Sequence, residues 1–561
     1  MLMVSKATSR ETEAVTVVES LPETLYSLRL TAVNGNQDMR NEIRAEIKRL
    51  SAKAFTKARK GSQTEQKYRD KFERRTGINA GHPPAVLGVF AHPHFDPAHC
   101  KRHANAIASG IWHKVLGFDY QPQPALYFEL PKPDGSKRGV MAFGIPDAAV
   151  ANVVLRKTLQ RNKKRLSPHS YAYHPDKNVF DAILALNDVE REGKLFAVQI
   201  DFEKYFDNIP SSYIKKKISD KSNLSLTPHE RHIFESFLHH RYGDAVAHTA
   251  GQFKRRINGT PQGSSVSLFL ANLTNDDLDR QLAAESGRFV RFADDVVAIC
   301  GDYDAAQRLE KCFDRHCNQS GLILNRKKSP GIAVLSDHQH EIRTINDFTY
   351  LGYSFKETGL AMPQKTANKL KQKISRLINI YLVHALQFGF NPSRASRLNG
   401  YDWDLLGLIY ELRRGFYGGL KEQNISDFLY HGGRLSRMRG LMGFYCLIED
   451  SAQLKALDGW TLNVVRRACV HRRNILLSNH GRDCPTPSNR ELALGTWLSE
   501  NAWRDEGETS SPEDVEAVFP SLVRGWRAAR KHFFTYGLEG VQAPGYDSSM
   551  DVASLFDSPG Y

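Results

Sequence analysis

The sequence contains few cysteines and no long apolar run, and both absences narrow the class of protein. Its 561 residues include seven cysteines, an odd number, with no CxxC pair. This usage fits a reducing compartment better than a disulfide scaffold. No stretch reaches 18 apolar residues, and the N-terminus lacks a basic segment followed by an apolar core. We therefore expect a soluble, cytoplasmic protein with neither a membrane span nor a secretory signal.

Positive charge is in excess over negative charge. The chain has 77 Lys and Arg against 62 Asp and Glu, for a net charge of +15. An excess of this kind often accompanies a polyanionic partner, although it does not identify a fold. The hydrophobic content of 41% over this length predicts several well-buried modules rather than one core or a disordered chain.

The most basic segment lies near the N-terminus, between Arg40 and Arg75, with thirteen basic and five acidic residues. Arg49, Lys53, Lys57 and Lys60 recur at a spacing that places them along one side of a helix. Two interpretations are equally open for this stripe: a solvated helix face, or a surface that contacts phosphates.

Alternating and continuous apolar patterns predict the main elements. The stretch ALYFELPKPDGSKRGVMAFGIP predicts two strands joined by a turn at residues 133–135, and FAVQI predicts a buried strand that ends at Asp201. An apolar helix is expected over 265–284, a hairpin over 289–300 and a helix over 302–320. A strand pair around 340–356 precedes a largely helical remainder.

Three acids stand where these strands end or turn: Asp201, Asp294 and Asp295. Acids beside apolar strands are costly unless a positive charge compensates them. Magnesium does so with hard oxygen ligands, and two such ions about 3.5–4 Å apart can activate a hydroxyl and steady a leaving pyrophosphate. A single Asp in such a place is more often a turn or cap residue, so the acids need the context of other motifs.

That context is a series of blocks that resembles reverse transcriptases, particularly the bacterial branch related to group II intron enzymes. The fingers blocks are similar to KPDGSKRGVMAFGIP and RLSPHSYAYHPDKNVFDAIL. The palm blocks are similar to QIDFEKYFDNI, GTPQGSSVSLFLANL, RFADD, SGLILNRKKS and FTYLGYSF, and RLSRMRGLMGFY is similar to the end of the thumb. The blocks occur in the family's order and cover about 125 to 450.

The resemblance implies an α+β fold of the right-hand polymerase type, with fingers, a palm built on an antiparallel sheet, a helical thumb and largely helical extensions. The expected boundaries are a basic extension at 1–119, fingers at 120–195, palm at 196–360, thumb at 361–450 and an extension with a loose tail at 451–561. Residues 208–258 within the palm are expected to be partly fingers or a helical insertion.

The resemblance also implies the catalytic centre. Asp201 and Asp294 correspond to the acids that bridge two magnesium ions, for which manganese is an alternative. Asp295 supports the site from its edge, and the backbone carbonyl of Phe202 completes the shell of one ion. Phe206 corresponds to an aromatic gate against the sugar 2′-hydroxyl, which favours deoxynucleotides; a core phenylalanine is the alternative.

Further roles follow for the substrate. Lys132 and Arg138 correspond to cations that grip the triphosphate, and Gln262 lies against the nucleotide and template. Lys328 corresponds to a lysine that protonates the departing pyrophosphate, with Lys327 one position away in register. Gly352 belongs to the primer-grip turn.

The implied activity is RNA-directed DNA polymerisation, with an RNA template, deoxynucleoside triphosphates and a DNA product. The form of PQGSSVSLFLANL and the two extensions most resemble the defence-associated reverse transcriptases, which act against phage. That subclass implies a dedicated noncoding RNA and a homo-oligomer or a partner protein. The alternatives are a maturase or mobile-element reverse transcriptase, and a catalytically degenerate RNA-binding scaffold.

Two C-terminal segments, VVRRACVHRRNIL and RGWRAARKHFF, combine cations with apolar and aromatic residues. Either they contact phosphates and stack bases, or they form amphipathic helices that pack onto the thumb. Packing is the favoured interpretation.

Overall fold

The computed structural model describes residues 23–541 except 77–78, 80, 82–89, 132–134, 136, 173, 175, 190, 192, 222–223, 286–287, 385, 387–401 and 499–515. Lys132 and the C-terminal tail therefore lie outside the described residues. Within those that are described, no helix combines the length and the apolar character that a bilayer span requires.

The N-terminal part is helical and is dominated by the 54-residue helix α2 (Glu23–Thr76). Ile43 and Ile47 of α2 are buried against the neighbouring helices. Those neighbours are α3 (Pro97–Arg102), α4 (Ala104–Leu116) and α5 (Ile145–Asn162). The predicted helix over the basic segment is confirmed.

A four-stranded sheet follows in the order β2-β1-β4-β5. Its antiparallel pair β1 (Ala125–Pro131) and β2 (Lys137–Ala142) confirms the predicted hairpin. β4 (Arg241–Gly243) runs parallel to β1 and pairs with β5 (Lys254–Arg255), so part of segment 208–258 joins this sheet. The helices of this region are α7 (Tyr205–Asn208), α8 (Ser211–Ser219), α9 (Pro228–Leu238) and α10 (Ala245–Ala250).

The central sheet has five strands in the order β6-β7-β3-β8-β9 and is antiparallel except between β8 and β9. Successive side chains of a strand point to opposite faces, and both faces are buried. Val296 and Ala298 pack with α13, whereas Val297 and Ile299 pack in the core that contains α6. The elements are β3 (Leu195–Ile200), β6 (Arg288–Phe292), β7 (Asp295–Cys300), β8 (Gly331–Leu335), β9 (Thr344–Ile345), α6 (Val179–Asn187) and α13 (Tyr303–Ser320).

The single helix expected over 265–284 is wrong, because the structure has α11 (Ser265–Thr274) and α12 (Asp276–Ala283). The break falls at Asn275, whose backbone leaves the helical region. Its side-chain Oδ1 lies 3.0 Å from Nε2 of the buried His316 on α13.

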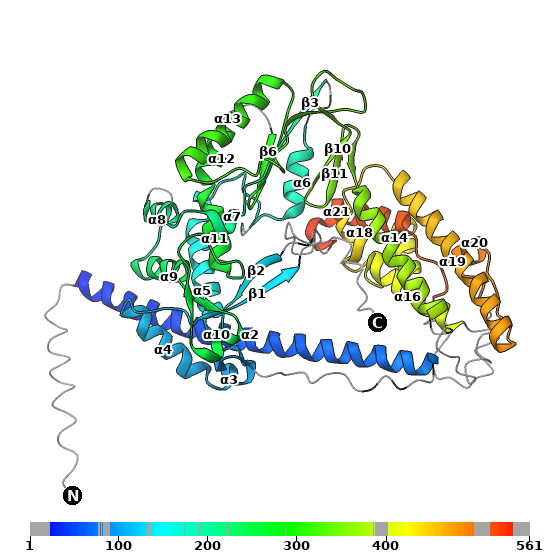
Figure 1. The fold of residues 1–561 in the computed structure, drawn as a ribbon, viewed down its shortest axis with the longest axis horizontal. Coiled ribbons are helices and arrows are strands. Elements are labelled where there is room, and N and C mark those ends of the chain that lie inside the picture. The colour runs from blue at the N-terminus through cyan, green and yellow to red at the C-terminus, as the bar shows by residue number, and fades with distance from the viewer. Residues whose placement is uncertain are drawn as a thin grey trace, which may run out of the picture.

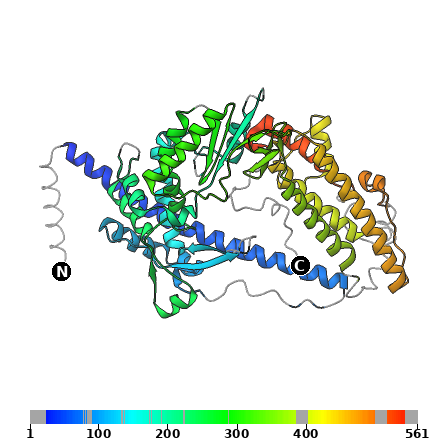
Figure 2. The ribbon, with the colours of Figure 1, turned by 45° about the horizontal axis from the view of Figure 1, so that its top comes forward.

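A small sheet, β10-β11-β12, leads into a helical lobe that lies on the far side of the central sheet from α12 and α13 (Figures 1 and 2). The predicted strand pair before the helices is confirmed. Antiparallel sheets with helices beside them confirm the predicted α+β class. The elements are β10 (Asp347–Tyr350), β11 (Tyr353–Lys356), β12 (Gly359–Ala361), α14 (Gln364–Ile378), α16 (Trp403–Tyr417), α17 (Glu422–Tyr430), α18 (Gly440–Phe444), α19 (Ala452–His480), α20 (Asn489–Leu494) and α21 (Leu522–Tyr536).

The two basic C-terminal segments form parts of α19 and α21, and three of their polar side chains pack within this lobe. Arg472 is buried and pairs with Asp402. The indole N–H of Trp526 and a guanidinium N–H of Arg530 both donate to the Ile448 carbonyl, at 3.0 and 2.9 Å. Packing is therefore confirmed for these three residues.

Candidate active site

The three acids singled out from the sequence meet at one edge of the central sheet. The β3–β7 register pairs Ile200 with Val296, so the next residues along each strand are Asp201 and Asp295. Asp294 precedes Asp295 in the turn between β6 and β7. The charge of Asp201 acts on both Asp294 and Asp295, so the three carboxyls are close neighbours.

The β6–β7 turn is tight and strained. Phe292 pairs with Asp295, which leaves only Ala293 and Asp294 between the strands. Ala293 has φ +63°, a left-handed conformation that residues with a Cβ seldom adopt. Its carbonyl accepts a hydrogen bond of 3.0 Å from Nη1 of Arg291. This bond helps to fix the turn that presents Asp294.

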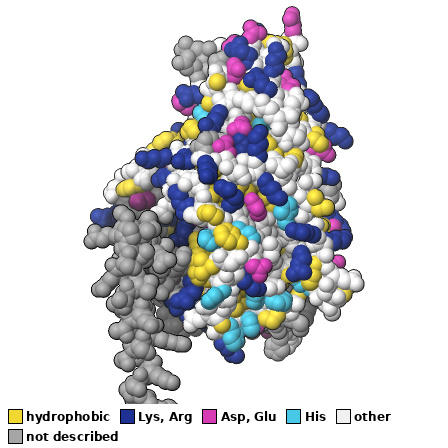
Figure 3. Space-filling model, turned by 90° about the vertical axis from the view of Figure 1, so that its left-hand side faces the viewer, with side chains coloured by type: hydrophobic (Ala, Val, Ile, Leu, Met, Phe, Trp, Pro, Cys, Tyr) yellow, Lys and Arg dark blue, Asp and Glu magenta, His cyan; other side chains and the backbone are white. Residues whose placement is uncertain are grey.

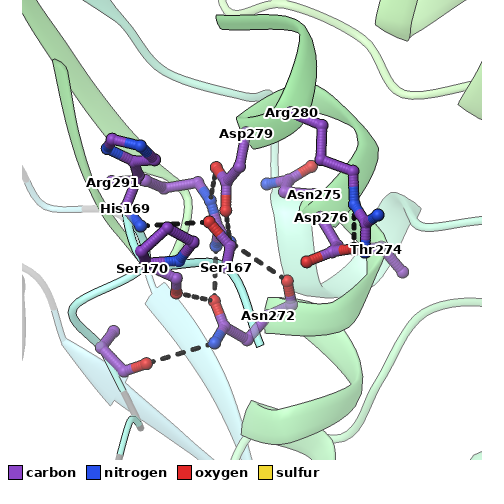
Figure 4. Close-up of polar contacts among 12 residues, drawn as sticks. Ser167, His169, Ser170, Asn272, Thr274, Asn275, Asp276, Asp279, Arg280 and Arg291 are labelled. Carbon is purple, nitrogen blue, oxygen red and sulfur yellow. Dashed lines mark hydrogen bonds and ion pairs between the residues drawn. The ribbon is translucent and has the colours of Figure 1, made fainter. Parts of the chain in front are cut away.

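Arg291 belongs to a fully buried polar network beneath the turn (Figure 4). Its Nε and Nη2 donate to the two carboxylate oxygens of Asp279 on α12, each at 2.6 Å. Nη1 also donates to Oδ1 of Asn272, which accepts from Ser170 at 2.6 Å. Sequence reasoning missed this network. The sequence feature that could have revealed the network is Arg291 itself, because an arginine within an apolar strand requires a buried acid elsewhere in the chain.

Asp201 is held from the other side by the segment that follows Ile323. Its backbone N–H donates to Oγ of Ser329 at 3.0 Å, and its carbonyl accepts from the Asn325 N–H at 2.8 Å. The carboxylate Oδ2 accepts from Nδ2 of Asn325 and lies 3.3 Å from Nζ of Lys328. Sequence patterns predicted a role for Lys328 but not for Asn325 and Ser329, which lie in the same NRKKS block.

Burial shifts the titration of the turn acids. It raises the pKa of Asp294 to about 6, with a further increase from the charge of Asp201. Burial and the charges of Asp294 and Asp201 raise the pKa of Asp295 to about 7. Both groups hold a proton more tightly in the folded chain than in the unfolded chain, so ionising them as pH rises through these values costs folding free energy. The protein's own cations do not fully compensate this charge.

A hard divalent cation would supply the missing positive charge. Within the described ranges, no three His, Cys, Asp or Glu side chains already form a metal-binding arrangement. The donors nevertheless suit Mg²⁺ or Mn²⁺, because three carboxyls share one sheet edge and two of them have raised pKa values. Phe202 is buried, and its backbone bridges to Leu324. A metal contact through its carbonyl stays a prediction.

The loop that follows Gly259 connects the β1–β2 hairpin to the end of the central sheet where the three acids lie. The Met141 N–H of β2 donates to the Gln262 carbonyl at 2.8 Å, and Arg138 donates to Oε1 of Gln262. Gly263 has φ +124°, and a Cβ there would lie 2.1 Å from the Met141 carbonyl oxygen, so only glycine fits. The positive charge of Arg138 lowers the pKa of Asp294 against the effect of burial. The structure therefore brings Arg138 and Gln262 beside the acids.

Phe206 lies under the same loop. Its side chain is only 7% exposed, and its carbonyl accepts from the Thr260 N–H at 2.7 Å. A Cβ at Gly259 would lie 2.3 Å from that carbonyl oxygen, so the close approach needs glycine. The ring contacts Tyr205 at a centroid distance of 5.6 Å. The backbone of Phe206 is thus fixed by the loop that carries Gln262.

Gly352 lies in the turn between β10 and β11, which comes later in the sequence than the three acids. Leu351 and Gly352 have φ +48° and +81°, the signs that a two-residue type I′ hairpin turn requires. The Gly352 carbonyl accepts from the hydroxyl of Tyr445 at 3.0 Å. This contact ties the turn to the helical lobe.

Comparisons with known proteins identify the part of the chain that carries this site. Residues 130–355 match the family "Reverse transcriptase (RNA-dependent DNA polymerase)". Mouse telomerase reverse transcriptase is 24% identical over 131 residues, which are 23% of this chain and 12% of the mouse protein. Protein YkfC of Escherichia coli K12 is 24% identical over 180 residues, which are 30% of this chain and 43% of YkfC. The chain thus spans less than half of either relative.

Solved structures of yeast telomerases also align with the chain. Telomerase from Candida albicans, in complex with a fragment of telomeric RNA, aligns over 65% of this chain and 63% of its own, with 13% identity and a TM-score of 0.33. Apo telomerase from Candida tropicalis aligns over 66% of this chain and 68% of its own, with 13% identity and a TM-score of 0.35.

Proposed function

We propose that the protein is an RNA-directed DNA polymerase, because residues 130–355 match the reverse transcriptase family. The observation that carries this proposal is the meeting of Asp201, Asp294 and Asp295 at one sheet edge, beside Arg138, Gln262 and Lys328. In this proposal the sheet of β1 and β2 belongs to the fingers, the central sheet is the palm and the helical lobe is the thumb.

The reaction joins the primer 3′-hydroxyl oxygen to the α-phosphorus of the nucleotide and breaks the bond to pyrophosphate. Asp201, Asp294 and Asp295 would hold divalent cations, which when bound activate the hydroxyl and stabilise charge on the phosphates. Arg138 binds triphosphate oxygens through charge-assisted hydrogen bonds, and Gln262 positions Arg138. Lys132, in the same hairpin, is proposed as a second triphosphate cation.

The direct test is DNA synthesis by the purified protein. With an RNA template, an annealed primer, deoxynucleotides and Mg²⁺, we expect labelled DNA of template-dependent sequence. An equal yield when the RNA is omitted would contradict templated synthesis, and no product on several RNA templates would favour the RNA-binding scaffold.

Lys328 is proposed to protonate the leaving pyrophosphate. Both Lys328 and Lys327 are exposed, but only the Nζ of Lys328 lies near Asp201, at 3.3 Å from its Oδ2; Lys327 has no such contact among the described residues. General acid catalysis contributes about 10²- to 10⁴-fold, so Lys328→Ala should lower the single-turnover rate at least about a hundredfold. Lys327→Ala is the matched control and should stay within about twofold. Equal losses in the two variants would reject this assignment.

Phe206 is proposed to exclude ribonucleotides by contact with the sugar 2′-hydroxyl. Phe206→Ala should raise the ratio of ribonucleotide to deoxynucleotide incorporation about 10- to 100-fold, the range expected for a steric change in a tight pocket. The ratio is measured with both substrates on one preparation, so a loss of folded protein cancels. An unchanged ratio would return Phe206 to a purely structural role.

We further propose that synthesis serves defence against phage and copies a dedicated noncoding RNA. The support is the resemblance of PQGSSVSLFLANL and of the extensions to defence-associated reverse transcriptases. Phage should form fewer plaques on cells with the wild-type gene than on cells with the Asp294→Asn variant. RNA that co-purifies with the protein should be one dominant species. Equal plaque numbers would contradict the defensive role without affecting the polymerase assignment.

A further inference from the structure

Helix α2 is packed along only one part of its length. Ile43, Glu46, Ile47 and Ser51 are buried. Glu42 and Glu46 also bond to α5, through Lys157 at 2.7 Å and Asn152 at 2.9 Å. Beyond Ser51 the helix continues to Thr76, yet none of the described side chains from 52 to 63 is buried.

This outer part, residues 52–76, extends away from the domain that anchors it. In two views α2 continues past the sheets toward the lower ends of α16 and α19 (Figures 1 and 2). Twenty-five helical residues span about 38 Å at 1.5 Å per residue. The outer part of α2 therefore reaches from the side of the β1–β2 sheet toward the helical lobe.

The exposed side of the outer part is cationic. Lys53 and Lys57 are exposed, continue the line of Arg49 and have no acidic partner among the described residues. Charge alone does not single out this surface, because Lys and Arg are scattered over the left-hand face of the molecule as well (Figure 3). What distinguishes the outer part of α2 is a cationic stripe on a helix whose described side chains form no buried face.

A helix without a packed face is poorly stabilised in water, because most helix stability in proteins comes from tertiary packing. Gly61 lies near the middle of the outer part and weakens the helix further. A partner that neutralises the stripe would stabilise both the charge and the helical conformation.

We propose that the outer part of α2 binds the phosphate backbone of a double-helical nucleic acid. A regular backbone matches cations that recur along one line of a straight helix, and their neutralisation releases counterions. The duplex proposed is the RNA–DNA hybrid that synthesis would generate, an identification that rests on the proposed function. In that position α2 opposes the helical lobe and retains the product during successive additions.

The charge is tested by binding the full-length protein to a preformed RNA–DNA hybrid without nucleotides. Lys53→Gln/Lys57→Gln should weaken binding and reduce the slope of log affinity against log salt by about 2, close to 0.9 for each phosphate that the variant no longer neutralises. The control, Lys311→Gln/Arg315→Gln, removes two exposed cations from α13 and should keep the wild-type slope. Equal slopes for all three proteins would overturn the proposal.

Substitutions of Gly61 test whether the helical conformation contributes to binding, because they leave the charge unchanged. A Cβ at this position meets no atom within 4 Å. Gly61→Ala should stabilise the helix and tighten hybrid binding about two- to fivefold, whereas Gly61→Pro should break the helix and weaken binding. If both variants bind like the wild type, the helical surface is not the binding element.

Two further arms separate this proposal from the polymerase assignment. Asp294→Asn should still bind the hybrid although its DNA synthesis is strongly reduced, whereas Lys53→Gln/Lys57→Gln should still extend the primer but dissociate sooner and release shorter products than the wild type. A preference for an RNA–RNA duplex over the hybrid would overturn the product assignment and indicate a structured RNA. If the wild-type protein binds the hybrid but makes no DNA, the α2 binding site is supported and the polymerase assignment is rejected.

Discussion

Asp294→Asn is expected to reduce DNA synthesis at least about a thousandfold. The substitution preserves the size of the side chain in the β6–β7 turn but removes the negative charge that a divalent cation requires. Removal of a metal ligand at the reacting phosphates costs several kcal/mol of transition-state stabilisation, and about 4 kcal/mol corresponds to a thousandfold lower rate. The measurement is single-turnover extension of a primer on an RNA template.

The matched control is Asp302→Asn, which changes an acid that caps α13 and lies beyond the opposite end of β7 from Asp294. We expect a rate within about twofold of wild type, with a small loss of stability from the cap. Persistent synthesis by Asp294→Asn, at more than a tenth of the wild-type rate, would show that the site has been assigned to the wrong acids.

Arg291→Met is expected to destabilise the fold by about 3–5 kcal/mol. Arg291 and Asp279 are each 1% exposed, so removal of the guanidinium leaves a buried carboxylate without its partner. It also removes the donor to the Ala293 carbonyl, which should loosen the turn that carries Asp294. The measurement is the midpoint of urea unfolding followed by tryptophan fluorescence.

Arg308→Gln provides the control for this destabilisation. Its ion pair with Glu285 has side chains that are 48% and 24% exposed, and pairs of this kind contribute about 0–1 kcal/mol. Replacement of both buried partners, in Arg291→Met/Asp279→Leu, should cost less than Arg291→Met alone, because no unpaired charge remains. A destabilisation equal to the sum of the two single substitutions would contradict a coupled buried pair.

Local patterns in the sequence predicted the strands and the acids that end them. FAVQI and FVRFADDVVAIC are apolar segments bounded by polar residues, and each forms the expected strand or hairpin. The α+β class and the positions of Asp201, Asp294 and Asp295 on these strands follow from such patterns, because hydrophobic periodicity is a local signal. Arg138, Gln262 and Lys328 were located through motifs, and the structure places them beside the acids.

Long-range polar contacts were not predictable in this way. Nothing near Arg291 in the sequence reveals that Asp279 and Asn272 are its partners, because α12 and α11 approach β6 only in the folded chain. At the break between α11 and α12, the Asn275 side chain similarly contacts His316, 41 residues away. Apolar residues continue on both sides of Asn275, so the periodicity of 265–284 predicted one helix where the structure has two.

The sequence also did not predict how much of α2 packs against other helices. The residues from 40 to 75 have one composition, yet burial stops at Ser51 among the side chains described up to residue 63. The boundary is set by where α3, α4 and α5 lie, and these helices come from later in the chain.

Three carboxyls from two separate stretches of chain, Asp201 with Asp294 and Asp295, are proposed to bind divalent cations jointly. Titration of the purified protein with Mn²⁺, followed by the electron paramagnetic resonance signal of the free ion, measures this binding directly. At pH 8, above the pKa values of about 6 and 7 for Asp294 and Asp295, we expect uptake by the wild type and its loss in both Asp201→Asn and Asp294→Asn. Uptake that both variants retain unchanged would show that these carboxyls do not form a shared cation site.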